Sequence, residues 1–210
     1  MGKSKFYVVW KGRTPGIYNN WEDCKAQIEG FPGQVFKSFD TKQLAEEAFN
    51  SESGKFIGKY VFESKLTPEQ LKSIGSPIRD SIAVDAAWNT KTGVVEFRGV
   101  SVETGKEYFH RGPFEDGTIN MGEFLAIVLA LAYCKSEKLD MPIYSDSQTA
   151  ISWVRDKEAR TGHEPSDRNK QLFDMIDSAL KWLKENDYPN KILKWETRAW
   201  GENPADFGRK

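Results

Sequence analysis

Residues 81–87 read SIAVDAA, a run of small and branched apolar side chains with one acidic residue, Asp85, inside it. A short apolar run of this kind predicts a buried strand. A carboxylate within a buried strand costs free energy unless it is paired or bound to a metal ion. The stretch therefore predicts a strand of the core that carries a functional acid.

The sequence beyond this strand indicates an α/β domain. Residues 94–100 and 106–111 predict two more strands with short turns between them, as in an antiparallel meander. Further patterns predict helices over 120–134, 147–157 and 168–186, strands over 142–145 and 192–195, and a short helix near 203–209. This order implies a mixed five-stranded sheet flanked by helices.

A smaller unit precedes this domain. Its patterns predict strands over 5–11, 17–18 and 34–39 and helices over 21–29 and 42–50, in the order β-β-α-β-α. A unit of this size is near the lower limit for independent folding. We expect a small domain over 1–50, a larger domain over 77–210, and between them a linker over 51–76 with a short strand or anchor at 60–62 and some local helix.

The composition is typical of a folded protein, since 39% of the 210 residues are hydrophobic and 13% are aromatic. Cys24 and Cys134 lie far apart in the sequence and fit a reduced compartment. The first apolar run is too short for a signal peptide, and no run approaches the roughly 18 residues of a membrane helix. We expect a cytoplasmic monomer that does not associate with membranes.

The net charge of −1 argues, as a total, against nucleic-acid binding. Its distribution changes that interpretation, because residues 1–76 carry 11 basic and 9 acidic side chains and residues 77–210 carry 19 and 22. A mildly basic unit therefore precedes an acidic one, whose excess negative charge bound cations would offset.

Four acids stand in or next to the predicted elements of the larger domain: Asp85, Glu123, Asp146 and Asp206. If they converge, an oxygen-rich cluster of this kind selects Mg²⁺ or Mn²⁺ rather than zinc. Two such ions about 4 Å apart are the usual device for phosphodiester cleavage. The pattern alone also fits purely structural roles, because Asp146 can cap a helix and Glu123 in a first helical turn can favour the helix dipole.

Residues 77–210 resemble the type 1 ribonucleases H over their whole length. The matching motifs are Val84-Asp85, NMGEFLA at 120–126, YSDSQTA at 144–150, and WGENPADFGRK at 200–210. The resemblance implies the ribonuclease H-like fold and four metal-binding carboxylates at Asp85, Glu123, Asp146 and Asp206. Glu202 matches an additional acid of bacterial relatives that assists metal exchange and product release.

The resemblance also implies the reaction. Two Mg²⁺ ions, with Mn²⁺ as a substitute, would cleave the RNA strand of an RNA/DNA hybrid and leave 5′-phosphate and 3′-hydroxyl ends. By position, Asn120 and Gln148 would contact the minor groove. A DNA phosphate would lie against Thr118, Asn120 and Thr161, and Thr197 and Lys194 would contact the nucleic-acid backbone.

The N-terminal residues 5–49 resemble the hybrid-binding, caulimovirus viroplasmin-like domain of type 1 ribonucleases H, which binds RNA/DNA hybrid or duplex RNA. By position, Trp21, Tyr7 and Phe36 would pack on the DNA strand and Lys37 would bind phosphate. Core packing is the alternative for Tyr7 and Phe36, because so small a domain has few core residues.

Three departures from the family pattern bear on affinity. Ile119 stands where many relatives have Asn, Thr90–Gly93 replaces a Gly-Asn-Pro-Gly turn, and Ser38 replaces a second Lys. Two other function classes fit part of the pattern: a non-catalytic binder of hybrid or double-stranded RNA, and another metal-dependent enzyme on the same fold, such as an integrase or exonuclease. The presence of all four acids and the hybrid-binding domain favour the ribonuclease.

Overall fold

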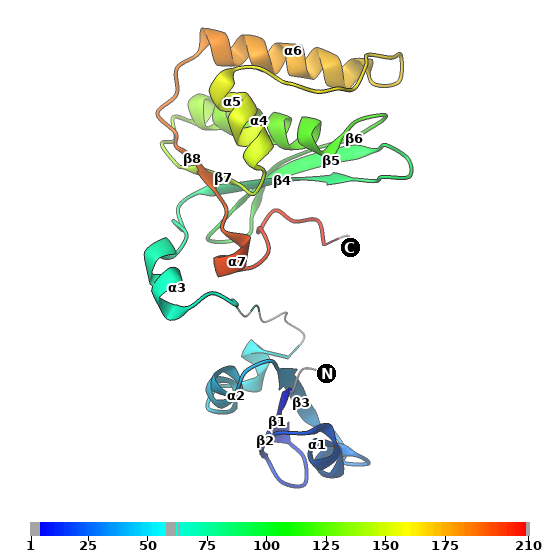
Figure 1. Ribbon diagram of the computed structural model, residues 1–210, viewed down its shortest axis with the longest axis vertical. Helices are drawn as coiled ribbons and strands as arrows, with labels where there is room; N and C mark the ends of the chain where they lie inside the picture. The colour runs from blue at the N-terminus through cyan, green and yellow to red at the C-terminus, as the bar shows by residue number, and fades with distance from the viewer. Residues whose placement is uncertain (1–4, 58–61, 63, 209–210) are drawn as a thin grey trace. The chain divides into compact units, whose positions relative to one another are not determined.

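The computed structural model describes residues 5–57, 62 and 64–208, in two compact units, Met1–Glu63 and Ser64–Lys210 (Figure 1). Tyr60 and Val61 of the strand expected at 60–62 lie outside the described residues, as do Arg209 and Lys210 of the last motif.

The smaller unit has the order β-β-α-β-α, as the sequence predicts. Its elements are β1 (Phe6–Lys11), β2 (Gly16–Tyr18), α1 (Trp21–Ile28), β3 (Val35–Phe39), α2 (Lys42–Phe49) and a 3-10 helix, η1 (Ser53–Lys55). Strand β1 pairs antiparallel with both β2 and β3. Asn20 and Thr41 cap the two helices, because each side chain accepts a hydrogen bond from a main-chain N–H of the first turn.

The core of this unit draws one residue from the expected linker. Phe56 is buried with Val8 and Phe39, and its ring stacks on that of Trp10 with the ring centroids 6.1 Å apart. One additional buried aromatic ring contributes considerable stability to a domain this small. The N-terminal part of the linker stretch is therefore part of the smaller unit.

The larger unit is built on a mixed five-stranded sheet, which confirms the predicted fold class. Its strands are β4 (Ile82–Trp88), β5 (Val95–Ser101), β6 (Glu107–Phe114), β7 (Ile143–Ser145) and β8 (Ile192–Lys194), and they lie in the order β6-β5-β4-β7-β8. Strands β4, β5 and β6 are antiparallel, and β7 is parallel to both β4 and β8. Strand β4 is therefore central, and its first five residues are buried.

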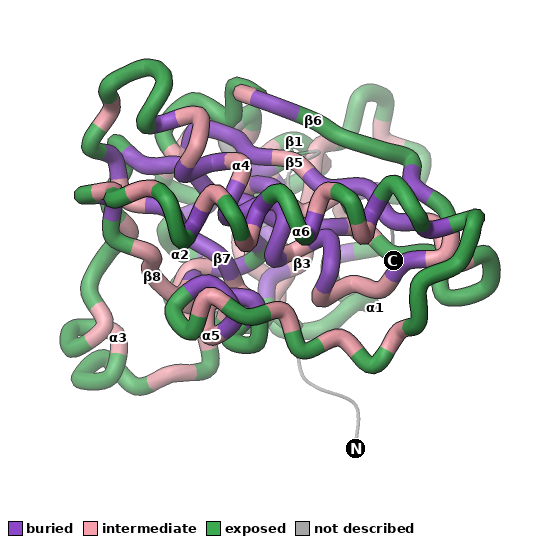
Figure 2. Tube along the Cα trace, turned by 90° about the horizontal axis from the view of Figure 1, so that it is seen from above, coloured by how far each residue is buried: buried purple, intermediate pink, exposed green. Residues whose placement is uncertain are grey.

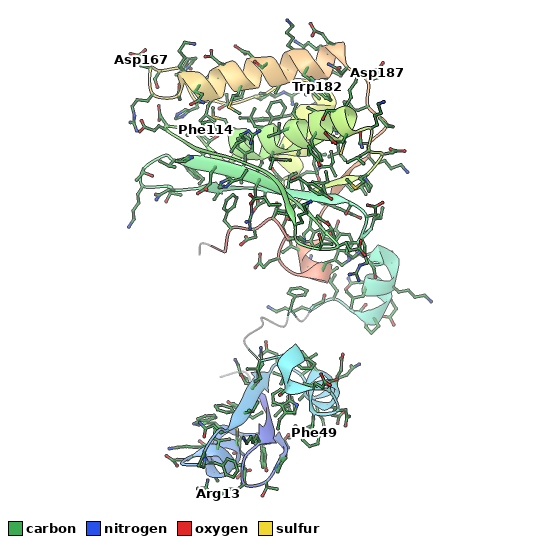
Figure 3. The ribbon with its side chains drawn as sticks, turned by 180° about the vertical axis from the view of Figure 1, so that it is seen from behind. Arg13, Phe49, Phe114, Asp167, Trp182 and Asp187 are labelled. Atoms are coloured by element: carbon green, nitrogen blue, oxygen red, sulfur yellow. The ribbon has the colours of Figure 1, made fainter. Side chains whose placement is uncertain are left out.

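Three helices cover one face of this sheet: α4 (Ile119–Glu137), α5 (Gln148–Asp156) and α6 (Lys170–Glu185) (Figure 1). Each turn of α6 has a buried side and an exposed side, as expected for an amphipathic surface helix (Figure 2). Trp182 of α6 packs against the core from the helix side that faces the sheet (Figure 3).

Helix α4 packs unusually close to the sheet at Gly122. A Cβ atom at this position would lie 2.7 Å from a Val95 methyl carbon and 2.8 Å from Cβ of Ala86. Only glycine permits that approach, which brings the next residue, Glu123, to the edge of β4. The helix is long and apolar enough to cross a membrane by composition, but 56% of that window is buried, so its apolarity is that of a core helix.

The C-terminal segment differs from the prediction of a short helix near 203–209. The helix there is α7 (Thr197–Trp200), and residues 201–208 are irregular. The prediction is wrong because Asn203 accepts a hydrogen bond from the N–H of Ala205 at 2.9 Å, a local contact that competes with helix formation.

Residues 64–76 of the linker stretch belong to the larger unit. Helix α3 (Pro68–Ile74) has a capping box made by Thr67 and Gln70. Beyond it, Trp200 donates its indole N–H to the carbonyl oxygen of Gly75 at 2.7 Å. This contact joins the linker stretch to the segment that carries Asp206.

Candidate active site

Three of the predicted carboxylates converge at one edge of the central sheet. Asp85 lies in β4, Glu123 in α4 and Asp146 directly after β7, and one carboxylate oxygen from each lies within 4.8 Å of the others. The parallel register pairs Val84 with Ser145, so the residues that follow them stand side by side. The sheet register and the close packing of α4 together build the cluster.

The structure excludes the purely structural roles for two of these acids. The cap of α5 is Ser147, whose hydroxyl oxygen accepts a hydrogen bond from the N–H of Ala150 at 3.2 Å, so the capping role of Asp146 is wrong. Helix α4 begins at Ile119, capped by Thr118, which puts Glu123 beyond the first turn and away from the N-terminal N–H groups.

Ionisation of the clustered carboxyl groups is unfavourable. Burial raises the pKa of Asp85 to about 8, and the charges of Asp146, Glu123 and Asp206 add to this effect. Burial also raises the pKa of Glu123 to about 7, against the opposing effects of a hydrogen bond from Ser147 and the charge of Lys194. The pKa values indicate that a cation is needed to keep all of these carboxylates ionised at neutral pH.

The donor set fits a hard divalent cation. Oδ1 of Asp146 is buried and has no hydrogen-bond partner among the residues that the structure describes. A buried carboxylate oxygen without a hydrogen-bond partner, on a residue that stands beside two other acids, is unfavourable unless a cation binds there. Asp85, Glu123 and Asp146 offer only oxygen ligands, which Mg²⁺ and Mn²⁺ prefer.

The fourth predicted carboxylate, Asp206, lies beside this group. It lines a cleft of about 600 Å³ together with Asp85 and the turn that follows β4. Its Oδ1 accepts a hydrogen bond from the N–H of Gly208 at 2.6 Å. Glu202, four residues earlier in the same irregular segment, is exposed.

Three of the predicted substrate-contacting residues share a second hollow. Thr118, Asn120 and Thr161 line a depression of about 230 Å³, together with Arg160 and His163. The sequence predicts no binding role for Arg160 or His163. For Arg160, the only indication of a binding role in the sequence is the Arg-Thr-Gly run at 160–162. This indication is weak because two acids, Asp156 and Glu158, precede the run.

Asp116 anchors the loop that carries Arg160 and Thr161. Its carboxylate lies 3.1 Å from Nε2 of His163 and accepts hydrogen bonds from Ser166 at 3.0 Å and Asn169 at 3.1 Å. The hydrogen bond from Ser166 and the contact with His163 lower the pKa of Asp116. The loop is therefore tied to the N-terminal end of α4, where Thr118 and Asn120 lie.

Of the remaining predicted contacts of the larger unit, Gln148 and Lys194 lie near Asp146. Gln148 is exposed at the first position of α5, and Thr197 begins α7. Lys194, at the end of β8, donates a short hydrogen bond from Nζ to the main-chain oxygen of Asp146. This lysine therefore holds the turn that carries a cluster acid.

The predicted aromatic residues of the smaller unit form one group. The ring centroid of Trp21 lies 5.5 Å from that of Tyr7 and 6.0 Å from that of Phe36. Trp21 is 41% exposed, whereas Tyr7 and Phe36 are half-buried against a small core of Val9, Cys24 and Ile28. Tyr7 and Phe36 therefore pack on the core and support an exposed indole at the same time.

Lys37 donates a hydrogen bond from Nζ to the carbonyl oxygen of Phe56 at 2.6 Å. Its predicted contact with a phosphate stays a prediction, and it requires this hydrogen bond to be exchanged for one to the ligand.

Comparisons with known proteins match both units. Residues 5–49 match the family model described as "Ribonuclease H1 N-terminal domain". The "Ribonuclease H" of Schizosaccharomyces pombe is 23% identical over 98% of this chain and 96% of its own length. The "Ribonuclease H1" of Rattus norvegicus is 40% identical over 36% of this chain and 27% of its own length.

Further matches cover part of the chain. The "Ribonuclease H" of Saccharomyces cerevisiae is 43% identical over 21% of this chain, and the match spans 13% of that protein. Among solved structures, RNase H1 from the halophilic archaeon Halobacterium salinarum NRC-1 matches 55% of this chain and 83% of its own, at 20% identity and a TM-score of 0.35.

Proposed function

Because this chain belongs to the type 1 ribonuclease H family, we propose that it hydrolyses the RNA strand of RNA/DNA hybrids with two divalent metal ions, Mg²⁺ or, as a substitute, Mn²⁺. The observation that carries the proposal is the group of Asp85, Glu123 and Asp146, whose oxygens lie within 4.8 Å of one another beside Asp206. The products would carry 5′-phosphate and 3′-hydroxyl ends.

The protein's own contribution is to hold anionic ligands in place. Bound cations would supply the activation of the attacking water and the stabilisation of the leaving 3′ oxygen. Asp85 and Asp146 are fixed by paired strands, and Glu123 by a core helix. Ser147 donates a hydrogen bond to Glu123 and favours its ionised form. Protons held by the cluster would leave when a cation binds.

The surroundings of the cluster suit a duplex ligand. The hollow lined by Thr118, Asn120 and Thr161 offers hydroxyl and amide donors to a phosphate of the DNA strand. Asn120 and Gln148 would reach the minor groove, where 2′-hydroxyl groups distinguish RNA from DNA. Glu202, exposed near Asp206, would assist metal exchange.

The smaller unit would supply additional affinity. Exposed Trp21, supported by Tyr7 and Phe36, offers an apolar surface for a sugar–phosphate strand, and the same surface would accept duplex RNA. A monomeric state and a cytoplasmic location stay predictions alongside this one.

One assay separates the proposed activity from non-catalytic binding. We expect labelled RNA/DNA hybrid, but neither duplex RNA nor duplex DNA, to be cut in Mg²⁺, and cutting to stop in EDTA and in Asp146→Asn. The matched control is Asp177→Asn, an exposed acid on α6, which should cut as the wild type does. Binding of hybrid without cutting in Mg²⁺ or Mn²⁺ would favour the binder, and equal cutting of duplex DNA would favour another nuclease.

A further inference from the structure

The segment that carries Asp206 is held by side chains rather than by regular structure. Residues 201–208, all of which the structure describes, contain no helix or strand. Buried Asn203 donates a hydrogen bond to the carbonyl oxygen of Val84 at 2.9 Å. That contact fixes the start of the segment to β4 next to Asp85. It does not orient Asp206, which lies three residues further on.

Arg98 of β5 supplies the missing contacts. Its Nε donates to the carbonyl oxygen of Ala205 at 2.8 Å, and its Nη2 donates to the carbonyl oxygen of Asp206 at 2.7 Å. The guanidinium carbon also lies 4.6 Å from the centroid of the Phe207 ring. One side chain thus holds three consecutive residues, with the acid in the middle.

The sheet register explains why Arg98 can reach this segment. Arg98 is the antiparallel partner of Asp85, so the two side chains leave the sheet on the same face. Nonetheless its two short hydrogen bonds go to main-chain carbonyls, and its nearest acidic partner is Glu107, at 3.7 Å. The Arg98 guanidinium therefore orders the segment through its main chain and leaves the cluster carboxylates available for metal ions.

Phe207 is held from a second side. Its ring centroid lies 5.6 Å from that of His110, and Nε2 of His110 lies 2.9 Å from Oε2 of Glu96, a buried residue. The ring therefore contacts side chains of both β5 and β6. The two hydrogen bonds from Arg98 hold the main chain beside this ring. Hydrogen bonds from a charged guanidinium are stronger than neutral ones, and two parallel bonds also fix orientation.

We propose that Arg98 is a positioning residue: by clamping the main chain on both sides of the Ala205–Asp206 peptide and stacking on Phe207, it aims the Asp206 carboxylate at the metal-binding cluster. The proposal rests on the proposed function in one respect, that Asp206 is a metal ligand. Arg98 itself need touch neither metal nor substrate.

The test is a double-mutant cycle on the full chain, with Mn²⁺ binding as the readout. We expect Arg98→Met to raise the dissociation constant of Mn²⁺ about tenfold, the scale of residues that orient metal ligands, and Arg98→Lys to fall between it and the wild type. Asp206→Asn should weaken binding by at least as much, and Arg98→Met added to it should cause little further loss. The control is Arg79→Met, an exposed arginine paired with Glu103 on the surface, which should bind as the wild type does.

Two more measurements separate positioning from general stabilisation. Hydrogen exchange over residues 203–208 of the metal-free protein should be faster in Arg98→Met, with strand β4 unchanged. In hybrid cleavage, the Mg²⁺ concentration for half-maximal rate should rise while KM for hybrid stays the same.

Equal Mn²⁺ affinity in wild type and Arg98→Met, or an equal loss from Arg98→Met with and without Asp206→Asn, would overturn the proposal. If Arg98→Met does not fold, Arg98→Lys carries the same cycle and the same two criteria. A wild type that binds Mn²⁺ but cuts no hybrid contradicts the proposed function alone, because the Mn²⁺ affinities still decide the role of Arg98.

Discussion

The two units place their candidate functional side chains at opposite depths. In the larger unit, Asp85 is only 9% exposed, within a central strand, whereas Trp21 in the smaller unit is 41% exposed at the start of a helix. A buried acid opposes folding until a cation binds, while an exposed indole changes stability little. Replacing a buried acid should therefore raise stability and lower activity. Replacing the exposed indole should affect binding alone.

The largest expected effect is at Asp85, where one substitution should lower the activity and raise the stability of the metal-free protein. Asp85→Asn removes a ligand of the cluster, so hybrid cleavage should fall roughly a thousandfold, the scale of a lost charged contact at a reacting group. The same change removes a carboxyl whose pKa is raised to about 8, so the metal-free protein should gain about 3 kcal/mol at pH 7. Urea unfolding in EDTA measures the gain, and a less stable variant would contradict the comparison.

The second effect is on the pH dependence of the metal-free protein. The pKa of Asp85 is about 8 in the folded protein and 3.8 as its ordinary value, so the folded state binds more protons between these limits. Its free energy of unfolding should therefore be highest at acid pH and fall by about 1 kcal/mol per pH unit on the way to pH 8. Denaturation at pH 5, 6, 7 and 8 measures this slope.

Mg²⁺ and Asp85→Asn provide the controls for that slope. Added Mg²⁺ should flatten it, since a bound cation holds the carboxylates ionised in the folded state. Asp85→Asn should reduce it in EDTA. A metal-free slope of the opposite sign would show that the cluster acids are already ionised at low pH.

A third effect belongs to the exposed surface of the smaller unit. Trp21→Ala should weaken hybrid binding about tenfold, the lower end of the range for an aromatic ring stacked on nucleic acid. The rate at saturating hybrid and the melting temperature should change little. Phe49→Ala is the matched control, because Phe49 is a similarly exposed aromatic residue on α2 (Figure 3). Equal losses in both variants would remove the specific role of Trp21.

The smallest expected effect is a gain in affinity for hybrid. Ser38→Lys adds the charge that related domains carry beside Lys37, on the half-buried strand β3. Hybrid binding should tighten, and the slope of log K against log salt should steepen by about 1. A salt titration of binding measures both, and an unchanged slope would show that position 38 does not face phosphate.

The sequence predicts most of the fold because strand and helix patterns are local. The run at 81–87 and its neighbours predict the five-stranded sheet, and their order implies its mixed character. Asp146 and Ser147 show the limit of such patterns. Both are good capping residues, and only the main-chain geometry shows that Ser147 takes the role and leaves Asp146 for the cluster.

The parts that the sequence did not predict depend on distant contacts. The irregular 203–208 segment is held by Arg98, more than a hundred positions away in the chain. Phe56 joins the core of the smaller unit through Trp10 and Phe39. Arg160 reaches the hollow near Asn120 only because Asp116 anchors its loop. None of these contacts leaves a periodic signal in the sequence.

Gly122 has a consequence for the design of variants. The gap between α4 and the sheet has no room for a single methyl group, as the distances to Val95 and Ala86 show. Replacing this glycine by alanine would push the helix outward and carry Glu123 away from Asp85. The spacing between the Asp85 and Glu123 carboxylates therefore depends on the absence of a side chain at position 122, and the size of the ion that the cluster would accept depends on it too.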